Sequence, residues 1–183
     1  MGNHKHPTIT TVDGKRKFDC FPAAVVAVIV NAEEKILMFA HPKRNRQWET
    51  VSGGLEKNET FWEGVLREVA EEIGSKAKVH PLGSVHTGTF QYDPNASHML
   101  SLSVVLTYES GEIVPGDDMA GSEFGWFTAD ELNSGDMKIL SPLDRPMIVN
   151  RALGLYRLWK TNPPTWEELQ PPLETERVTI RSK

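Results

Sequence analysis

The chain has only one cysteine and no long apolar run. Cys20 is the single cysteine among the 183 residues, so no disulfide can form within the chain. One cysteine is typical of a protein from a reducing compartment, and we expect a cytoplasmic location. The longest apolar run, Ala23 to Val30, is far too short to span a membrane. The polar N-terminus has no signal-peptide core, so we expect no membrane attachment.

Neither sign of charge dominates. The chain has 20 Lys and Arg against 25 Asp and Glu, a formal net charge of −5. This balance disfavours broad binding to a nucleic-acid polymer or an anionic membrane, but a nucleotide substrate remains compatible because bound cations offset local charge. Hydrophobic residues make up 39% and charged residues 25%, which is typical of a globular protein. The length fits one domain with extensions.

The most informative stretch runs from Gly53 to Ser75 and contains three closely spaced carboxylates, Glu68, Glu71 and Glu72. On a helix, residues three and four apart share a face, and like charges there destabilise by ~0.2–0.5 kcal/mol per pair. A purely structural helix gains nothing from this cluster. A hard divalent cation would neutralise it, and an all-oxygen set suits Mg²⁺ or Mn²⁺.

The flanks of this cluster predict a helix. Thr60 and Glu63 have the spacing of a capping box, and Gly74 provides a stop. Apolar residues between them recur at helical spacing and predict a buried face. Gly64 is unfavourable inside a helix, so we expect it to mark a close approach.

The segment resembles the Nudix box, G-x5-E-x7-R-E-U-x-E-E-x-G-U, where U is a bulky apolar residue. The matching residues are Gly53, Glu59, Arg67, Glu68, Val69, Glu71, Glu72 and Gly74. The last apolar position is Ser75, and Ser52 stands where many members have proline. Both departures lie at the edges of the motif and remove no candidate ligand.

The order of predicted elements gives a mixed α/β fold. The main predicted strands cover Ala23–Val30, Lys35–Ala40, Lys78–Val85, Leu100–Tyr108 and Glu123–Phe127. The polar stretch from Thr87 to His98 is expected to be a strand end followed by a substrate-side loop. A short helix is predicted from Thr128, a longer one over Leu143–Lys160 and a turn over Trp166–Leu169. The resemblance implies the Nudix-type α/β/α sandwich with a mixed central sheet over residues 21–140. Residues 1–20 are expected to form a flexible arm, with one short edge strand around Thr8–Val12, and residues 141–183 a helix and a proline-containing tail.

The resemblance also implies an activity and its machinery. It predicts a hydrolase that cleaves the phosphoanhydride of a nucleoside diphosphate linked to another moiety. Glu68, Glu71 and Glu72, with the carbonyl of Gly53, would hold Mg²⁺ or Mn²⁺, and Arg67 would orient a carboxylate. The catalytic base would be Glu68 or a distal carboxylate. Glu123 is the best distal candidate, followed by Asp117 and Asp118.

Substrate contacts are less defined by sequence. A basic loop before the glycines carries Arg44 and Arg46, which either bind substrate phosphates or lie solvated on the surface. Trp48 and Tyr92 are candidates to stack on a base, although aromatic residues commonly belong to a core. The competing interpretation is a non-catalytic nucleotide-sensing binding module on the same fold. A homodimer is compatible with the C-terminal helix.

Overall fold

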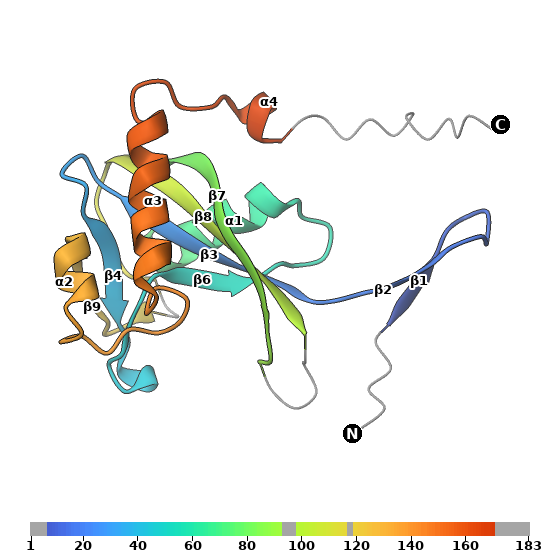
Figure 1. The fold of residues 1–183 in the computed structure, drawn as a ribbon, viewed down its shortest axis with the longest axis horizontal. Helices are drawn as coiled ribbons and strands as arrows, with labels where there is room; N and C mark the ends of the chain where they lie inside the picture. The colour runs from blue at the N-terminus through green and yellow to red at the C-terminus, as the bar shows by residue number, and fades with distance from the viewer. Residues whose placement is uncertain (1–6, 93–97, 117–118, 171–183) are drawn as a thin grey trace.

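Strand β3 lies at the centre of a seven-stranded mixed sheet in the computed structural model, which describes residues 7–92, 98–116 and 119–170. It pairs in parallel with β8 and antiparallel with β4 and β6, while β7 lies outside β8, and β5 and β9 pair with β4 (Figure 1). The strands are β3 (Ala23–Val30), β4 (Ile36–Ala40), β5 (Trp48–Glu49), β6 (Val51–Gly54), β7 (Lys78–Phe90), β8 (Met99–Ser110) and β9 (Glu123–Phe127).

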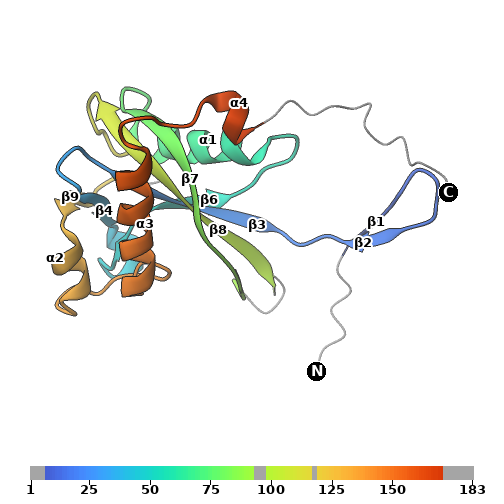
Figure 2. The ribbon, with the colours of Figure 1, turned by 45° about the horizontal axis from the view of Figure 1, so that its top comes forward.

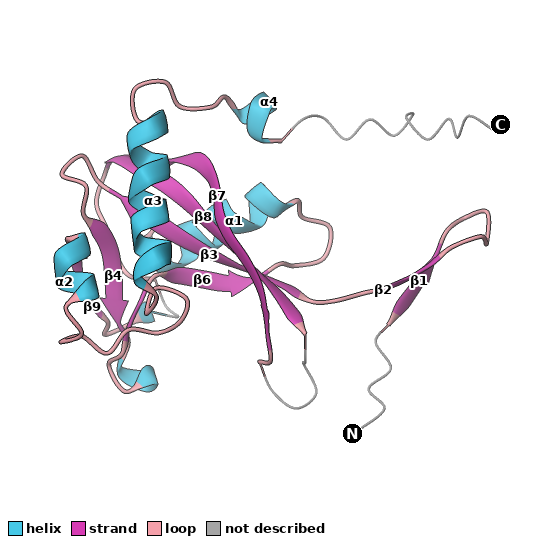
Figure 3. Ribbon diagram, in the orientation of Figure 1, coloured by secondary structure: helices cyan, strands magenta, loops and turns pink. Residues whose placement is uncertain are grey.

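The two faces of the sheet are covered by different helices, and the residues of β3 alternate between them. Val25, Ala27 and Ile29 pack in the cluster that contains α1, whereas Val28 and Val30 pack in the cluster with α3. This two-residue period explains why β3 is apolar throughout its buried length. Helices therefore sandwich the strands (Figure 3), and the predicted α/β/α arrangement is confirmed. The helices are α1 (Phe61–Ile73), α2 (Ala129–Asn133), α3 (Pro146–Trp159), α4 (Trp166–Leu169) and the 3₁₀ helix η1 (Pro42–Arg44).

One strand is longer than the sequence predicts. β7 runs without a break through Phe90, although we expected one strand over Lys78–Val85 and a separate strand end with a loop from Thr87 onward. The pairing with β8 shifts between Pro81 and Gly83 and again between Ser84 and His86. These bulges absorb the residues that break a regular ladder, and proline is tolerated on an edge strand.

The ends of α1 are fixed by the predicted cap and by backbone hydrogen bonds from the loop that follows β8. Thr60 accepts a hydrogen bond from the backbone N–H of Glu63, whose carboxylate bonds back, so the capping box is confirmed. At the other end, the backbone N–H groups of Val114 and Gly116 donate to the carbonyls of Ile73 and Glu72, at 2.9 and 3.2 Å. The loop thus satisfies carbonyls that a helix end leaves unpaired.

The N-terminal segment forms a separate hairpin. β1 (Thr8–Thr10) pairs antiparallel with β2 (Lys17–Asp19), so the expected edge strand has a partner within the arm. Figures 1 and 2 show this hairpin standing away from the main sheet. The first six residues and the tail beyond residue 170 lie outside the described residues.

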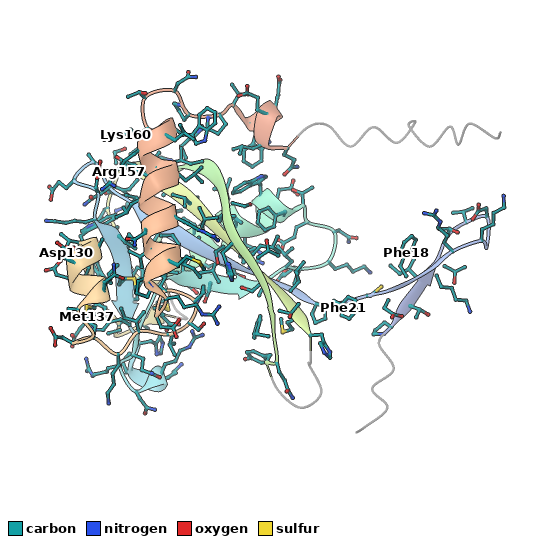
Figure 4. All side chains as sticks on the ribbon, in the orientation of Figure 1. Phe18, Phe21, Asp130, Met137, Arg157 and Lys160 are labelled. Atoms are coloured by element: carbon teal, nitrogen blue, oxygen red, sulfur yellow. The ribbon has the colours of Figure 1, made fainter. Side chains whose placement is uncertain are left out.

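The C-terminal helix covers the sheet. α3 begins at Pro146, three residues after the predicted start, and buries Ile148, Ala152 and Tyr156 against it. Arg157 and Lys160, labelled on α3 in Figure 4, both bond the Glu34 carboxylate in the β3–β4 turn, Arg157 Nε at 2.7 Å and Lys160 Nζ at 3.0 Å. α4 confirms the predicted turn. None of the helices in the described ranges combines the length and apolarity needed to cross a bilayer.

Two glycines provide a matched stability test. A Cβ at Gly116 would lie 1.8 Å from the carbonyl oxygen of Glu71, which is backbone and cannot swing away. We expect Gly116→Ala to lower the free energy of unfolding by about 1–3 kcal/mol. Gly154 lies in α3 with open space at its Cβ, and Gly154→Ala should instead stabilise by about 0.5–1 kcal/mol. Urea denaturation measures both, and equal effects of the two changes would contradict the packing described here.

Candidate active site

The centre of the candidate site is the contact between β6 and α1. A Cβ on Gly53 would lie 2.0 Å from Cδ of Glu68, so the carboxylate of this buried glutamate fills the space directly beside the glycine. Burial raises the pKa of Glu68, and the hydrogen bond from Arg67 opposes that shift. Glycine is required here because any side chain would displace the carboxylate from the strand.

Arg67 holds the acidic side chains of the α1 stripe in place. Its Nε and Nη2 donate to both oxygens of Glu59, at 3.0 and 2.9 Å, in a bidentate pair. Nη1 donates to Glu68 at 2.8 Å and to Glu71 at 3.0 Å. Nη2 also reaches the carbonyl of Gly54 at 2.9 Å and so ties the helix to β6. The predicted orienting role of Arg67 fits these contacts.

Glu72 is the most strongly perturbed carboxylate of the stripe. Its side chain is buried, Oε1 accepts a long 3.5 Å bond from the backbone N–H of Ser52, and Oε2 lacks a partner among the described residues. Burial raises its pKa to about 8, with smaller contributions from the charges of Glu49 and Glu68. The side chain of Glu71, in contrast to that of Glu72, is half exposed.

These groups offer oxygen donors only, which fits a hard cation such as Mg²⁺ or Mn²⁺. The unpartnered Oε2 of Glu72 is a buried oxygen that a cation would satisfy. In the arrangement described, however, Glu68 and Glu71 are bonded to Arg67. Within residues 7–92, 98–116 and 119–170, no three His, Cys, Asp or Glu side chains lie together as a ready metal-binding group.

The distal candidate base lies elsewhere. Glu123 begins β9, is exposed, and pairs with Arg46. The charges that act on Glu68 and Glu72 come from neighbours on α1, η1 and β5. The structure therefore brings Glu123 and Arg46 to each other rather than into the Glu68 group. Asp117 and Asp118 lie outside the described residues.

A pocket of about 570 Å³ opens beside the glycine turn. Ser52, Gly53 and Gly54 form part of its wall, so the backbone that contacts Glu68 and Glu72 also faces the pocket. The basic and aromatic residues of its lining come from four separate segments of the chain: Arg44, His86, Phe90, Tyr92 and Arg145. Cationic and aromatic side chains together suit a ligand with phosphates and a flat ring.

The predicted substrate residues separate into two groups. Arg44 and Tyr92 line the pocket, whereas Arg46 and Trp48 do not belong to its lining. Trp48 packs edge-on against Phe127, with ring centroids 4.7 Å apart, and joins the cluster beneath α3. Its backbone also bonds Lys138 and Leu140. Trp48 thus packs in the core, which was the alternative to base stacking in the sequence analysis.

Several lining residues were missed by sequence reasoning. Arg145 precedes α3, far from the box, and His86 and Phe90 lie on the part of β7 where a strand end and loop were expected. No local pattern marks them, because they meet only when the chain folds. Gly64 was predicted to mark a close approach, because glycine is unfavourable inside a helix. The groups that lie close to it are the side chains of Leu55 and Glu59.

A family model described as the NUDIX domain matches residues 21–148. The chain belongs to the Nudix family. The family prediction is therefore confirmed, and the match runs past the predicted domain end at residue 140 into the start of α3.

Curated Nudix relatives match over part of their length. A NAD-capped RNA hydrolase of Vibrio parahaemolyticus is 34% identical over 113 residues, which is 61% of this chain and 40% of that protein. An ADP-ribose pyrophosphatase of Methanocaldococcus jannaschii is 34% identical over 107 residues, 56% of this chain and 61% of that protein. The chain thus covers less than two thirds of the length of either relative.

Solved Nudix structures confirm the fold. A NUDIX hydrolase from Nitrosomonas europaea superposes with a TM-score of 0.59 at 21% identity, over 82% of this chain and 97% of the other. A NUDIX-family hydrolase from Clostridium perfringens gives 0.58 at 22% identity, over 74% and 96%. At these identities the likeness establishes the architecture, the Nudix α/β/α sandwich.

The perturbed carboxylate of the Nudix box predicts a pH-dependent stability. The pKa of Glu72 lies above its ordinary value of 4.5 in the folded chain, so folding favours the protonated form. Without divalent cations, the free energy of unfolding should therefore fall as pH rises from about 4.5 to 8. Glu72→Gln should flatten this decline. Urea denaturation in EDTA across that range measures it, and identical slopes for both proteins would contradict the burial of Glu72.

Proposed function

We propose that the chain is a divalent-metal-dependent hydrolase that cleaves the phosphoanhydride of a nucleoside diphosphate linked to another moiety. Residues 21–140 with the start of α3 would form the catalytic domain, flanked by the N-terminal arm and the tail. The candidate substrates are NTPs and dNTPs, ADP-ribose, nucleotide sugars and dinucleoside polyphosphates. The names of the two curated relatives, an ADP-ribose pyrophosphatase and a NAD-capped RNA hydrolase, support a substrate of this class.

One observation carries the proposal. Ser52 and Gly53 line the basic and aromatic pocket, and they also lie against Glu72 and Glu68 of α1, respectively. A diphosphate in the pocket would therefore lie next to the carboxylates. A helix that served only the fold would have no reason to place buried acids beside an open pocket.

The box residues would hold the cation. Glu68, Glu71 and Glu72, with the carbonyl of Gly53, would supply its oxygen ligands. When bound, a divalent cation neutralises phosphate charge and lowers the pKa of a water molecule. Arg67 already fixes Glu68 and Glu71, so it would keep their oxygens oriented.

The remaining chemistry belongs to other side chains. Arg44 and Arg145 would bind the phosphates, and the rings of Phe90 and Tyr92 would stack on the base. Glu68 is better placed than Glu123 to accept the proton of the attacking water, since it lies against Gly53 at the pocket wall. In-line attack would release two phosphorylated products.

A panel assay tests the proposal. With Mg²⁺ or Mn²⁺, the protein should hydrolyse at least one of standard and oxidised NTPs, ADP-ribose, nucleotide sugars, dinucleoside polyphosphates or NAD-capped RNA, with products resolved by chromatography. Glu72→Gln should reduce kcat by at least about 100-fold while circular dichroism remains unchanged. Glu112→Gln, at an exposed ion pair with Lys76, serves as the control and should keep wild-type kcat.

Tight nucleotide binding without turnover of any panel member would favour the nucleotide-sensing module instead. In that case Glu72→Gln would leave nucleotide affinity unchanged, because no reaction depends on it. Isothermal titration with each nucleotide in the absence of metal distinguishes the two functions.

The pocket predicts a role for Tyr92. Its ring is 73% exposed at the lining, so it has little part in the core. Tyr92→Ala should raise KM about fivefold to tenfold with a smaller effect on kcat, because base stacking contributes about 1–3 kcal/mol. Tyr92→Phe keeps the ring and should retain wild-type KM. Equal loss in both variants would argue against stacking.

A further inference from the structure

Glu49 is a buried carboxylate that lies outside the Nudix box, and no sequence motif assigns it a function. It ends β5, pairs with Phe39 of β4, and is 5% exposed. Arg44 donates to Oε2, whereas Oε1 is buried and lacks a partner among the described residues. An unpartnered carboxylate oxygen removed from water is costly, so its retention requires an explanation.

A purely structural ion pair explains Glu49 poorly. Arg44 is about half exposed, at 52%, and engages one oxygen of the pair. A buried ion pair often stabilises no better than apolar side chains of similar volume, because both charges lose hydration. The neighbours of β5 are largely apolar, so a hydrophobic residue at position 49 would avoid the cost.

The surroundings of Glu49 point toward the box. Glu49 and Glu72 are both buried, and each has one oxygen without a partner in the described residues. The charge of Glu49 raises the pKa of Glu72, and that of Arg44 lowers it, so the three groups act on one another. Arg44 in turn lines the pocket. Glu49 is thus bonded to an arginine of the pocket lining and acts electrostatically on a carboxylate of the box.

We propose that Glu49 contributes its unpartnered Oε1 and its charge to the divalent-cation site formed by the box, while Oε2 holds Arg44 at the pocket. The inference rests on the proposed function, since it assumes that the box binds a cation. It adds to that function a carboxylate from β5. One residue would then connect the cation site to the phosphate-binding side chain.

Manganese binding measured without substrate tests the role of Glu49. Mn²⁺ alone is titrated into the full chain, and free Mn²⁺ is read by electron paramagnetic resonance. Glu49→Gln keeps the size of the side chain and an acceptor for Arg44, and should weaken Mn²⁺ binding about tenfold. Glu112→Gln removes one charge from an exposed ion pair and should bind Mn²⁺ as the wild type does.

Thermal unfolding separates this role from a structural one. In EDTA, Glu49→Gln should keep or raise Tm, because an amide replaces a desolvated charge. Its gain in Tm on adding Mn²⁺ should be smaller than that of the wild type, since weaker binding stabilises less. A lower Tm in EDTA together with wild-type Mn²⁺ affinity would overturn the proposal and assign Glu49 to the fold.

A second variant covers a failure of Glu49→Gln to fold. Glu49→Asp keeps the charge but shortens the side chain by one methylene, and should show intermediate Mn²⁺ affinity. Wild-type affinity in this variant would also overturn the proposal. If the wild type itself binds no Mn²⁺, both this inference and the proposed function fail. If it binds Mn²⁺ and either folded Glu49 variant matches it, this inference alone fails.

Discussion

Repulsion between acidic side chains in a confined space is the constraint on which this structure depends. Glu68 and Glu72 are pressed between α1 and β6, where water no longer screens them, and burial raises the pKa of both. Arg67 offsets part of the repulsion by donating to Glu59, Glu68 and Glu71 at once. The fold therefore keeps several carboxyl groups close together next to a glycine strand.

The scaffold around this region is built to keep it in place. β3 pairs on one edge with β6, which carries Gly53, and on the other with β8, so the glycine strand is fixed to the best-buried part of the sheet. The loop that ends at Gly116 bonds the last turn of α1 and holds the end of the helix that bears Glu72. Two independent contacts thus set the distance between the carboxylates and the strand.

The pocket is assembled by a different principle. Its basic and aromatic side chains come from η1, the extended end of β7 and the segment before α3, which are distant in the sequence. Apart from Gly53 and Gly54, the pocket lining therefore lies outside the box. The position of Arg44, bonded to Glu49 and facing the pocket, links these parts of the lining to the carboxylates.

Sequence patterns predicted those helices and strands that depend on residues close together in the chain. The capping box at Thr60, the apolar spacing of α1 and the uniform apolarity of β3 each specify a structure through neighbours a few residues away. The acidic stripe and its eight matching positions likewise determined the family. These features could be predicted because helix and strand periods convert sequence spacing directly into position on a face.

The residues outside the Nudix box that line the pocket could be identified only from the tertiary structure. Trp48 went to the core and Tyr92 to the pocket, although both are aromatic residues in polar surroundings of the sequence. β7 continues through Pro81 and Gly83 because its pairing with β8 shifts register between these two residues. Glu49 became buried because β5 pairs with β4, where Glu49 lies opposite Phe39. Burial and pairing between distant segments depend on the whole chain, and no local pattern encodes them.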